Sequence, residues 1–351
     1  MFVRESTRTI RIGDKIIGGG NDILVQSMTN TDTRDVESTT TQIYRLVDAG
    51  CELVRLAIPD EEAAAALARI KKTTSIPIVA DIHFDYRLAL KALEAGVDKL
   101  RINPGNIGDE DRVRAVVSAA KERCVPIRIG VNAGSLKKMD DELPVVERMI
   151  ISLSEQVEIL ERMEFYDIVI SLKSSDVNTT IDAYRRCAEI FSYPLHLGMT
   201  EAGPMPSGLV KSSVGIGSLL HLGLGDTIRV SLTEDPVIEV EAGFQILNSL
   251  GLRRKGIDIV SCPTCGRCEV DLKRIVDKVV LETKKIDAPI KVAIMGCVVN
   301  GPNEASDADI GVACGKGCGL LFKYGEVISK FSEEDIVEAL LKEIYEMTDG
   351  K

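Results

Sequence analysis

Eight short runs of β-branched and aliphatic residues recur along the first 250 residues of the chain, and stretches with helical periodicity separate them. The predicted strands span residues 23–28, 53–58, 77–82, 98–103, 126–131, 167–172, 194–199 and 227–232. Two of the helical stretches, residues 37–50 and 85–96, end in Gly, the residue that helix C-termini favour. This recurrence is typical of parallel βαβ units with right-handed crossovers.

Eight such units predict a (β/α)8 TIM barrel over residues 1–250. A doubly wound open sheet is the alternative, but it usually has fewer strands and a glycine-rich turn after the first one. The segment GIGSLL at 215–220 is only half of that glycine motif and lies in a helical stretch. The barrel is therefore the favoured fold.

The rest of the chain predicts a second, smaller domain over residues 257–351, after a linker at 248–258. A helix at 269–286, a strand at 291–296 and a final helix at 332–347 indicate an α+β domain.

Composition excludes several classes of protein. With 351 residues, 45% of them hydrophobic, the chain can bury a large core, which argues against disorder. The net charge of −11 opposes general attraction to nucleic acid or an anionic membrane, and the absence of Trp argues against a base-stacking surface. Residues 212–225 form the longest uncharged stretch, which is too short to span a bilayer. The first residues lack the apolar segment of a signal peptide. We expect a soluble, cytoplasmic protein.

Basic residues lie within, or at the ends of, otherwise apolar strands. The four arginines of this kind are Arg55, Arg101, Arg128 and Arg229. The other polar residues near the carboxyl ends of the strands include Asp81, His83, Asn132, Lys173, Thr200, Glu201 and Ser231. These ends carry the active site in a TIM barrel. His196 and His221, by contrast, are expected to be structural.

A buried guanidinium without a counter-charge costs several kcal/mol, so these cations need partners. Either each pairs with a local carboxylate, such as Asp81, Asp98 or Glu201, or together they bind one multiply charged anion. Three carboxylates are too few for four arginines and Lys173, which favours the shared anion. Phosphate or diphosphate is the expected group, because arginine binds its oxygens in a bidentate manner.

Six of the nine cysteines lie between residues 262 and 318. An odd number in a cytoplasmic chain argues against a disulfide framework. Cys262, Cys265 and Cys268 form two overlapping Cys-x2-Cys pairs, and Cys297 follows a predicted strand. No second Cys-x2-Cys pair completes a four-cysteine zinc site, and Glu304 is the carboxylate nearest to Cys297. The spacing leaves open both an iron–sulfur cluster and a structural zinc ion.

Motifs of seven to fourteen residues then carry a resemblance to a known family. They are QSMTNTDT (26–33), VADIHFDYRLAL (79–90), LRINPGNIG (100–108), IRIGVNAGSL (127–136), HLGMTEAG (196–203), GLGDTIRVSLTEDP (223–236), SCPTCGR (261–267) and MGCVVNGPNEA (295–305). Together they resemble the family of 4-hydroxy-3-methylbut-2-enyl diphosphate synthase, in its short bacterial form, from about residue 6 to residue 345.

The resemblance implies a [4Fe–4S] cluster in place of zinc, held by Cys262, Cys265, Cys297 and Glu304. The substrate-binding residues that it implies are Arg55, His83, Arg101, Arg128, Lys173, Thr200 and Ser231, with Asp81, Asn132, Glu201 and Asn300 nearby, and we add Arg229 for its place in the last strand. It also implies a homodimer in which the cluster domain of one subunit covers the barrel of the other. The chain departs from the family at Asn303, where Gly is usual, and at Cys268, Cys314 and Cys318, which are not family ligands.

The expected reaction is a reductive ring opening of 2-C-methyl-D-erythritol 2,4-cyclodiphosphate. Arginine and lysine side chains would stabilise the departing diphosphate, and Glu201, with Asp81, Asn132 and Glu304, forms the expected catalytic set. Because no nucleotide-binding loop is evident, a flavodoxin or ferredoxin is the expected electron donor. Two alternatives are a non-redox barrel enzyme with a structural zinc domain, which acts on a phosphorylated substrate, and an electron carrier without catalysis.

Overall fold

The structure is a computed structural model, and it describes residues 4–136, 143–297 and 307–349. The chain divides into two compact units, Met1–Arg253 and Arg254–Lys351. Each unit has its own apolar core, so each is described by itself. Within the described residues, no helix is long and apolar enough to cross a membrane.

The first unit alternates strands and helices. Its elements after the first hairpin are β3 (Leu24–Met28), α1 (Val36–Asp48), β4 (Leu53–Ala57), α2 (Glu61–Thr73), β5 (Ile78–Asp81), α3 (Tyr86–Glu94), β6 (Lys99–Ile102), α4 (Glu110–Glu122), β7 (Ile127–Asn132), α5 (Val145–Arg162), β8 (Ile168–Lys173), α6 (Val177–Ile190), β9 (His196–Leu197), α7 (Ser207–His221), β10 (Thr227–Ile228) and α8 (Pro236–Ser249). The eight strands correspond to the predicted ones, and GIGSLL lies inside α7.

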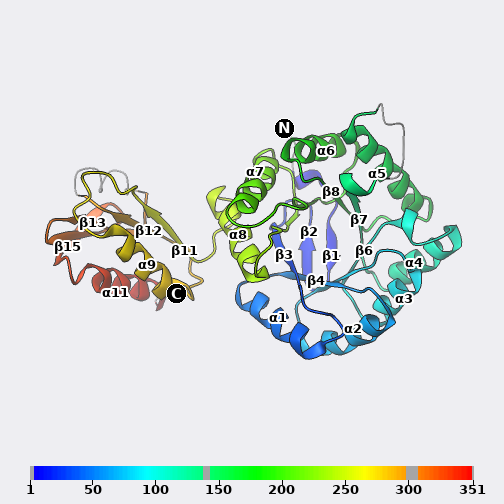
Figure 1. Cartoon of the computed structure of the whole chain (residues 1–351), viewed down its shortest axis with the longest axis horizontal. Coiled ribbons are helices and arrows are strands. Elements are labelled where there is room, and N and C mark those ends of the chain that lie inside the picture. Colours follow the sequence, from blue (N-terminus) through cyan, green and yellow to red (C-terminus); the bar gives the residue numbers. More distant parts are fainter. Residues whose placement is uncertain (1–3, 137–142, 298–306, 350–351) are drawn as a thin grey trace. The chain divides into compact units, whose positions relative to one another are not determined.

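The described strands of this unit form one parallel sheet in the order β8-β7-β6-β5-β4-β3-β10-β9. A single bridge between Ile170 and Leu195 joins its two edges, which closes the ring. Helices α1 to α8 surround the strands in Figure 1. The predicted TIM barrel is therefore confirmed.

Strands β9 and β10 are shorter than the sequence predicts. Regular pairing ends at Leu197 and Ile228, but the backbone continues along the barrel. The amide of Arg229 donates to the Leu197 carbonyl at 2.9 Å, and that of Thr200 donates to the Ser174 carbonyl at 3.3 Å.

Aspartate residues begin most of the barrel helices. In each case the carboxylate accepts a hydrogen bond from a backbone N–H of the first turn, a group that has no partner inside the helix. The capping residues are Asp35, Asp60, Asp85, Asp109, Asp176 and Asp235, for α1, α2, α3, α4, α6 and α8. These caps fix where each βα loop ends, at the face where the strands terminate.

A hairpin that the sequence analysis did not predict closes the other end of the barrel. Strands β1 (Ile10–Ile12) and β2 (Lys15–Ile17) pair antiparallel and lie across the centre of the ring in Figure 1. Ile10, Ile12 and Ile17 of the hairpin form a buried cluster with the inward-facing residues Leu24, Leu53 and Val169 of β3, β4 and β8. This apolar floor leaves only the carboxyl ends of the strands for a polar site.

The second unit is a mixed sheet with helices on one face. Its elements are β11 (Ile257–Ser261), α9 (Leu272–Thr283), β12 (Ile290–Met295), β13 (Ile310–Gly315), β14 (Cys318–Lys323), β15 (Glu326–Ser332) and α11 (Ile336–Asp349). The sheet order is β11-β12-β13-β14-β15, parallel up to β13 and antiparallel after it. Helices α9 and α11 share one core with β12, β13 and β14. The predicted α+β fold is confirmed.

Candidate active site

Strand alternation places a set of basic side chains inside the barrel. The aliphatic residues of β6 and β7, such as Leu100 and Ile127, pack against the helices, so their neighbours point inward. Arg101, Arg128 and Lys173 are buried there, with only 7%, 1% and 8% of their surfaces exposed. Charged side chains are almost never this buried unless a partner compensates them.

Asp81 is the acidic centre of this set. Its carboxylate accepts a short hydrogen bond from Nη2 of Arg55, lies 3.4 Å from Nη1 of Arg101 and 4.0 Å from Nδ1 of His83. Burial disfavours the ionised form of Asp81, but the charges of Arg55 and Arg101 outweigh it and hold the pKa of the carboxyl below its usual value. Asp81 is therefore an anion that orients two guanidinium groups.

Arg229 has a different partner, which the sequence analysis missed. Glu239 of α8 lies 3.7 Å from Nη2 of Arg229 and also accepts hydrogen bonds from the Leu232 amide at 2.8 Å and the Ser27 hydroxyl at 3.4 Å. Burial raises the pKa of this carboxyl despite the arginine. The signal was present in the sequence, because Glu239 interrupts the apolar segment PVIEV at the start of α8.

The remaining cations exceed what these two carboxylates can neutralise. Nε and Nη1 of Arg128 are buried and have no hydrogen-bond partner in the described chain, and the same holds for Nε of Arg55 and of Arg229. Burial and the charges of Arg128 and Arg229 lower the pKa of Lys173 well below its usual value. Unpaired buried donors carry a desolvation penalty that an anion would remove.

Two glycines make room for these side chains. A Cβ on Gly130 would lie 3.1 Å from Nε of Arg101, and one on Gly198 would lie 2.9 Å from Nζ of Lys173. Both contacts are tighter than ordinary van der Waals packing. The backbone of β7 and the chain after β9 therefore leave space for the cationic side chains.

Two carboxylates that the sequence suggested as partners do not pair with these arginines. Asp98 bonds Lys71 and accepts a hydrogen bond from the Ile78 amide at 2.7 Å instead, at the amino ends of β5 and β6. Glu201 is exposed, with a positive φ of 52°, and makes no ion pair within the described residues. Local pairing thus explains Arg55, Arg101 and Arg229 in part, but not Arg128 or Lys173.

The structure brings most of the predicted site residues to one end of the barrel. Asn132 ends β7 beside Lys173 in register, His83 follows β5 as an exposed side chain, Thr200 and Glu201 follow β9, and Ser231 follows β10. Asn300, Glu304 and Asn303 lie outside the described residues.

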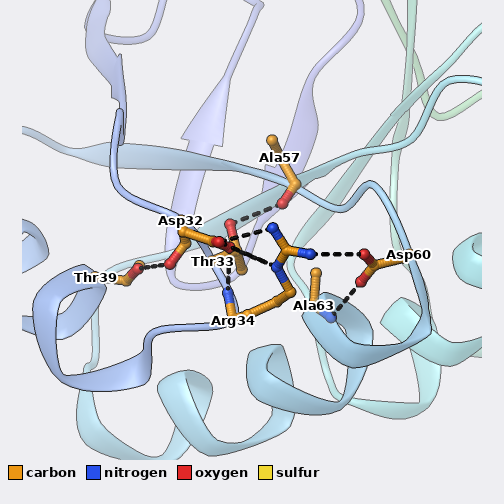
Figure 2. A network of polar contacts seen from close by, with 7 residues as sticks. All are labelled: Asp32, Thr33, Arg34, Thr39, Ala57, Asp60 and Ala63. Carbon is orange, nitrogen blue, oxygen red and sulfur yellow. Dashed lines mark hydrogen bonds and ion pairs between the residues drawn. The ribbon is translucent and has the colours of Figure 1, made fainter.

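The loops after β3 and β4 are joined by a polar network at the same end (Figure 2). Arg34 binds Asp32 through two nitrogens, at 2.7 and 2.9 Å, and reaches Asp60 at 3.3 Å. The hydroxyl of Thr33 donates to the Ala57 carbonyl at 2.8 Å. Part of the motif QSMTNTDT therefore has a structural role, because it fixes the first loop to the N-terminus of α2.

The cysteines of the second unit gather at the carboxyl ends of two neighbouring strands. Cys262 follows β11 and Cys297 follows β12, and these strands pair in parallel up to Ser261 and Ile294. The Gly296 amide donates to Sγ of Cys262 at 3.2 Å, and a Cβ on Gly296 would lie 2.6 Å from Sγ of Cys268. The thiols of Cys262 and Cys268 thus lie beside Gly296, the residue before Cys297.

These thiols differ in their surroundings. Cys265 is exposed, and hydrogen bonds from Arg267 lower the pKa of its thiol, which favours the thiolate. Sγ of Cys268 donates to the Val270 carbonyl at 3.3 Å. Burial raises the pKa of Cys314 to about 12, so that thiol stays protonated. Among the described residues, no three His, Cys, Asp or Glu side chains are gathered closely enough to hold a metal ion.

The two units of the chain match the two domains of one known family. The model of the GcpE TIM-barrel domain matches residues 7–244, and that of the GcpE protein C-terminal domain matches residues 258–346. The chain belongs to the GcpE family. This confirms the resemblance drawn from the motifs.

Relatives in this family match almost the whole chain. A protein of Caldanaerobacter subterraneus subsp. tengcongensis, named 4-hydroxy-3-methylbut-2-en-1-yl diphosphate synthase (flavodoxin), is 56% identical over 98% of this chain and 98% of its own length. Proteins with the same name from Geobacillus kaustophilus and Clostridium tetani are each 56% identical over 97% of this chain, and over 92% and 99% of their own lengths.

Solved structures with similar folds are more distant. Dihydropteroate synthase of Yersinia pestis has a TM-score of 0.51 at 11% identity, over 69% of this chain and 98% of that chain. The enzyme of Stenotrophomonas maltophilia has a TM-score of 0.52 at 14% identity, over 70% of this chain and 99% of that chain. At these identities the likeness concerns the barrel fold alone.

Proposed function

We propose that this GcpE-family protein is an iron–sulfur oxidoreductase that converts 2-C-methyl-D-erythritol 2,4-cyclodiphosphate into 4-hydroxy-3-methylbut-2-enyl diphosphate, a step of non-mevalonate isoprenoid synthesis. In this reaction the C2–O bond to the diphosphate breaks, a hydroxyl leaves as water, and the substrate takes up two electrons and one proton. The family relationship and the barrel interior support the same conclusion.

The observation that carries the proposal is the excess of buried cations at the mouth of the barrel. Arg128 and Lys173 have no carboxylate partner in the described chain, and the Nε donors of Arg55 and Arg229 are also unpaired. A cyclic diphosphate presents several anionic oxygens in a small volume, which suits forked guanidinium donors. A plain electron carrier has no use for such an anion site.

The chain's own residues would act mainly through electrostatics. Arg101, Arg128 and Lys173 would hold the diphosphate and stabilise the charge that develops on it as the C2–O bond breaks. Asp81 would keep Arg55 and Arg101 oriented before the substrate enters. Glu201 is exposed, so it can exchange protons with solvent, and we propose it as the donor to the leaving hydroxyl. The remaining proposed contacts are His83, Asn132, Thr200, Arg229, Ser231 and Asn300.

A [4Fe–4S] cluster, when bound, supplies electrons one at a time. Its proposed ligands are Cys262, Cys265, Cys297 and Glu304. The donor set fits such a group in its chemistry, because the soft residues Cys262 and Cys297 follow two neighbouring parallel strands and Cys265 favours its thiolate. Cys268 is not included, since its Sγ–H is directed to a backbone carbonyl.

We further propose a flavodoxin, or failing that a ferredoxin, as electron donor, and a homodimer in which each barrel is completed by the partner's cluster domain. The proposed compartment is the cytoplasm, where thiols remain reduced.

Anaerobic turnover tests the function. The iron-loaded protein should convert the cyclic diphosphate with dithionite and a viologen, and elemental analysis should find iron rather than zinc. Arg128→Met should lower kcat/KM by at least about thirtyfold, because it removes one fork from a desolvated anion. The visible absorbance of the cluster should not change.

Arg114→Met is the matched control, because this exposed arginine of α4 pairs only with Glu110 within the described residues. It should leave turnover unchanged. Zinc in place of iron, or no turnover by the iron-loaded parent, would reject the oxidoreductase. Unchanged kcat/KM in Arg128→Met would place the anion site elsewhere.

A further inference from the structure

Lys99 is a fully buried lysine that the proposed site does not use. It begins β6 two residues before Arg101, so both side chains point into the barrel and Lys99 lies one layer deeper. Its Nζ donates to Oε1 of Gln26 at 3.2 Å. The charged groups acting on it are Arg128 and Arg55, and within the described chain it forms no ion pair.

The groups that face the interior come from every strand of the barrel. In strand order they are Gln26, Arg55, Asp81, Lys99 and Arg101, Arg128, Lys173, His196 and Thr227, with Arg229 and its partner Glu239 beyond β10. Six of these described side chains are cationic types and two are carboxylates. His196 is neutral here, since burial and the nearby cations lower its pKa well below the usual value.

Only the lysines of this cluster can lose a proton and so lower the electrostatic repulsion between its cations, because arginine keeps its proton in proteins. Burial, followed by the charges of Arg128 and Arg55, lowers the pKa of Lys99 well below its usual value. A polyanion at the mouth offsets the positive potential of the arginines, which favours the ammonium form again. Lys173 responds in the same direction, but it lies at the end of β8, where a ligand can touch it.

We propose that Lys99 is a positioning residue of the anion site, an inference that rests on the function proposed above. Lys99 is neutral until a polyanion enters the barrel, and its Nζ then takes up one proton from solvent. The new charge strengthens anion binding from the layer below Arg101, without contact with the ligand. Anion affinity is therefore linked to proton uptake.

Calorimetric titration with sodium sulfate tests this linkage, since sulfate itself takes up no proton near neutral or alkaline pH. Titrations in two buffers of different ionisation enthalpy give the protons bound per anion. The parent should take up protons and bind sulfate more weakly as the pH rises. Lys99→Met should bind about tenfold more weakly and take up at least about half a proton less.

Lys99→Arg should restore affinity without restoring that share of the proton uptake, because guanidinium is already charged. Lys91→Met, a surface change in α3 at a lysine paired with Glu61, should match the parent in both measurements. If Lys99→Met does not fold, Lys173→Met is measured instead. Proton uptake that persists when Lys173 is absent supports Lys99 as the group that takes up the proton.

Sulfate binding by the parent without proton uptake would overturn the role of Lys99 but leave the anion site intact. Equal proton uptake in the parent and Lys99→Met would also overturn the role of Lys99 and leave the anion site intact. No sulfate binding by the parent would reject the anion site itself, and with it the proposed function. The titration needs neither cluster nor turnover, so these failures are distinguishable.

Discussion

Asp81 shows how a single carboxylate can organise the basic side chains of the proposed anion site. It neutralises part of the charge of Arg55 and Arg101, and its ionised form is favoured by both. A fully compensated barrel would have no affinity for a polyanion, and an uncompensated one would be costly to fold. The barrel lies between these limits, because carboxylates compensate some of its buried arginines but not Arg128 within the described residues.

Asp81→Asn should therefore lower the free energy of unfolding by about 3 kcal/mol, since it leaves buried guanidinium groups unpaired. Sulfate should recover part of that loss. Because the pKa of Asp81 is depressed in the folded protein, its contribution is present above the pKa of an unfolded Asp and is lost as the pH falls through the folded value. The difference in denaturation midpoint between parent and variant should shrink below about pH 4. A difference that is constant with pH would contradict this role.

The cysteines of the second unit allow a prediction with an internal control. Cys262→Ser, Cys265→Ser and Cys297→Ser should each abolish the visible absorbance of the iron-loaded protein, because iron prefers thiolate. Cys268→Ser should retain both absorbance and turnover, since its thiol bonds the Val270 carbonyl. Loss of the cluster in Cys268→Ser, with one of the other three unaffected, would change the ligand assignment.

The segments after β9 and β10 depend on close backbone approach. A Cβ on Gly198 would lie 2.7 Å from the Arg229 carbonyl as well as 2.9 Å from Nζ of Lys173. These contacts explain why a residue without a Cβ follows Leu197, where the barrel closes. Strand β9 ends at Leu197, and the missing Cβ of Gly198 leaves room for the side chain of Lys173.

Gly198→Ala should lower stability by about 1–3 kcal/mol through overpacking and also weaken sulfate binding, because Lys173 must move. Gly217→Ala is the control, since a Cβ there meets nothing within 4 Å and lies inside α7. That variant should bind sulfate like the parent and be more stable by up to about 1 kcal/mol. Chemical denaturation and calorimetry measure both quantities. Normal sulfate affinity in Gly198→Ala would show that Lys173 does not take part.

The division of the chain into two units bears on how the molecule would work as an assembly. The proposed anion-binding residues belong to the first unit and the proposed cluster ligands to the second. If a barrel is completed by the partner's second unit, an inactive barrel and an inactive cluster can be combined in one dimer so that one intact site remains.

Arg128→Met subunits, which are strongly impaired alone, and Cys297→Ser subunits, which are inactive alone, should therefore regain turnover when they are unfolded, mixed and refolded with iron and sulfide. Random pairing should give about a quarter of the parent's activity, since half of the dimers are mixed and each has one intact site. Each variant treated alone is the control. No recovery, despite mixed dimers seen by mass spectrometry, would mean that the site lies within one subunit.

Several features of the molecule follow from local sequence patterns. The eight strands were predictable because β-branched runs alternate with amphipathic helices at a regular spacing, and the Asp caps mark where helices begin. The basic residues within strands, and the thiol spacing from Cys262 to Cys268, were equally visible. Long motifs in collinear order identified the family.

Tertiary structure decided which of these charges meet. Asp98 and Asp81 look alike in sequence, yet only Asp81 reaches the arginines, because Asp98 comes before β6 and Asp81 ends β5 at the opposite end of the barrel. Glu239 is 10 positions from Arg229 but meets it only because α8 folds back against β3. The excess of buried basic groups, Arg128, Lys173 and Lys99, depends on the whole ring of strands, since electrostatic energy depends on distances in space and on burial, and neither is a property of local sequence.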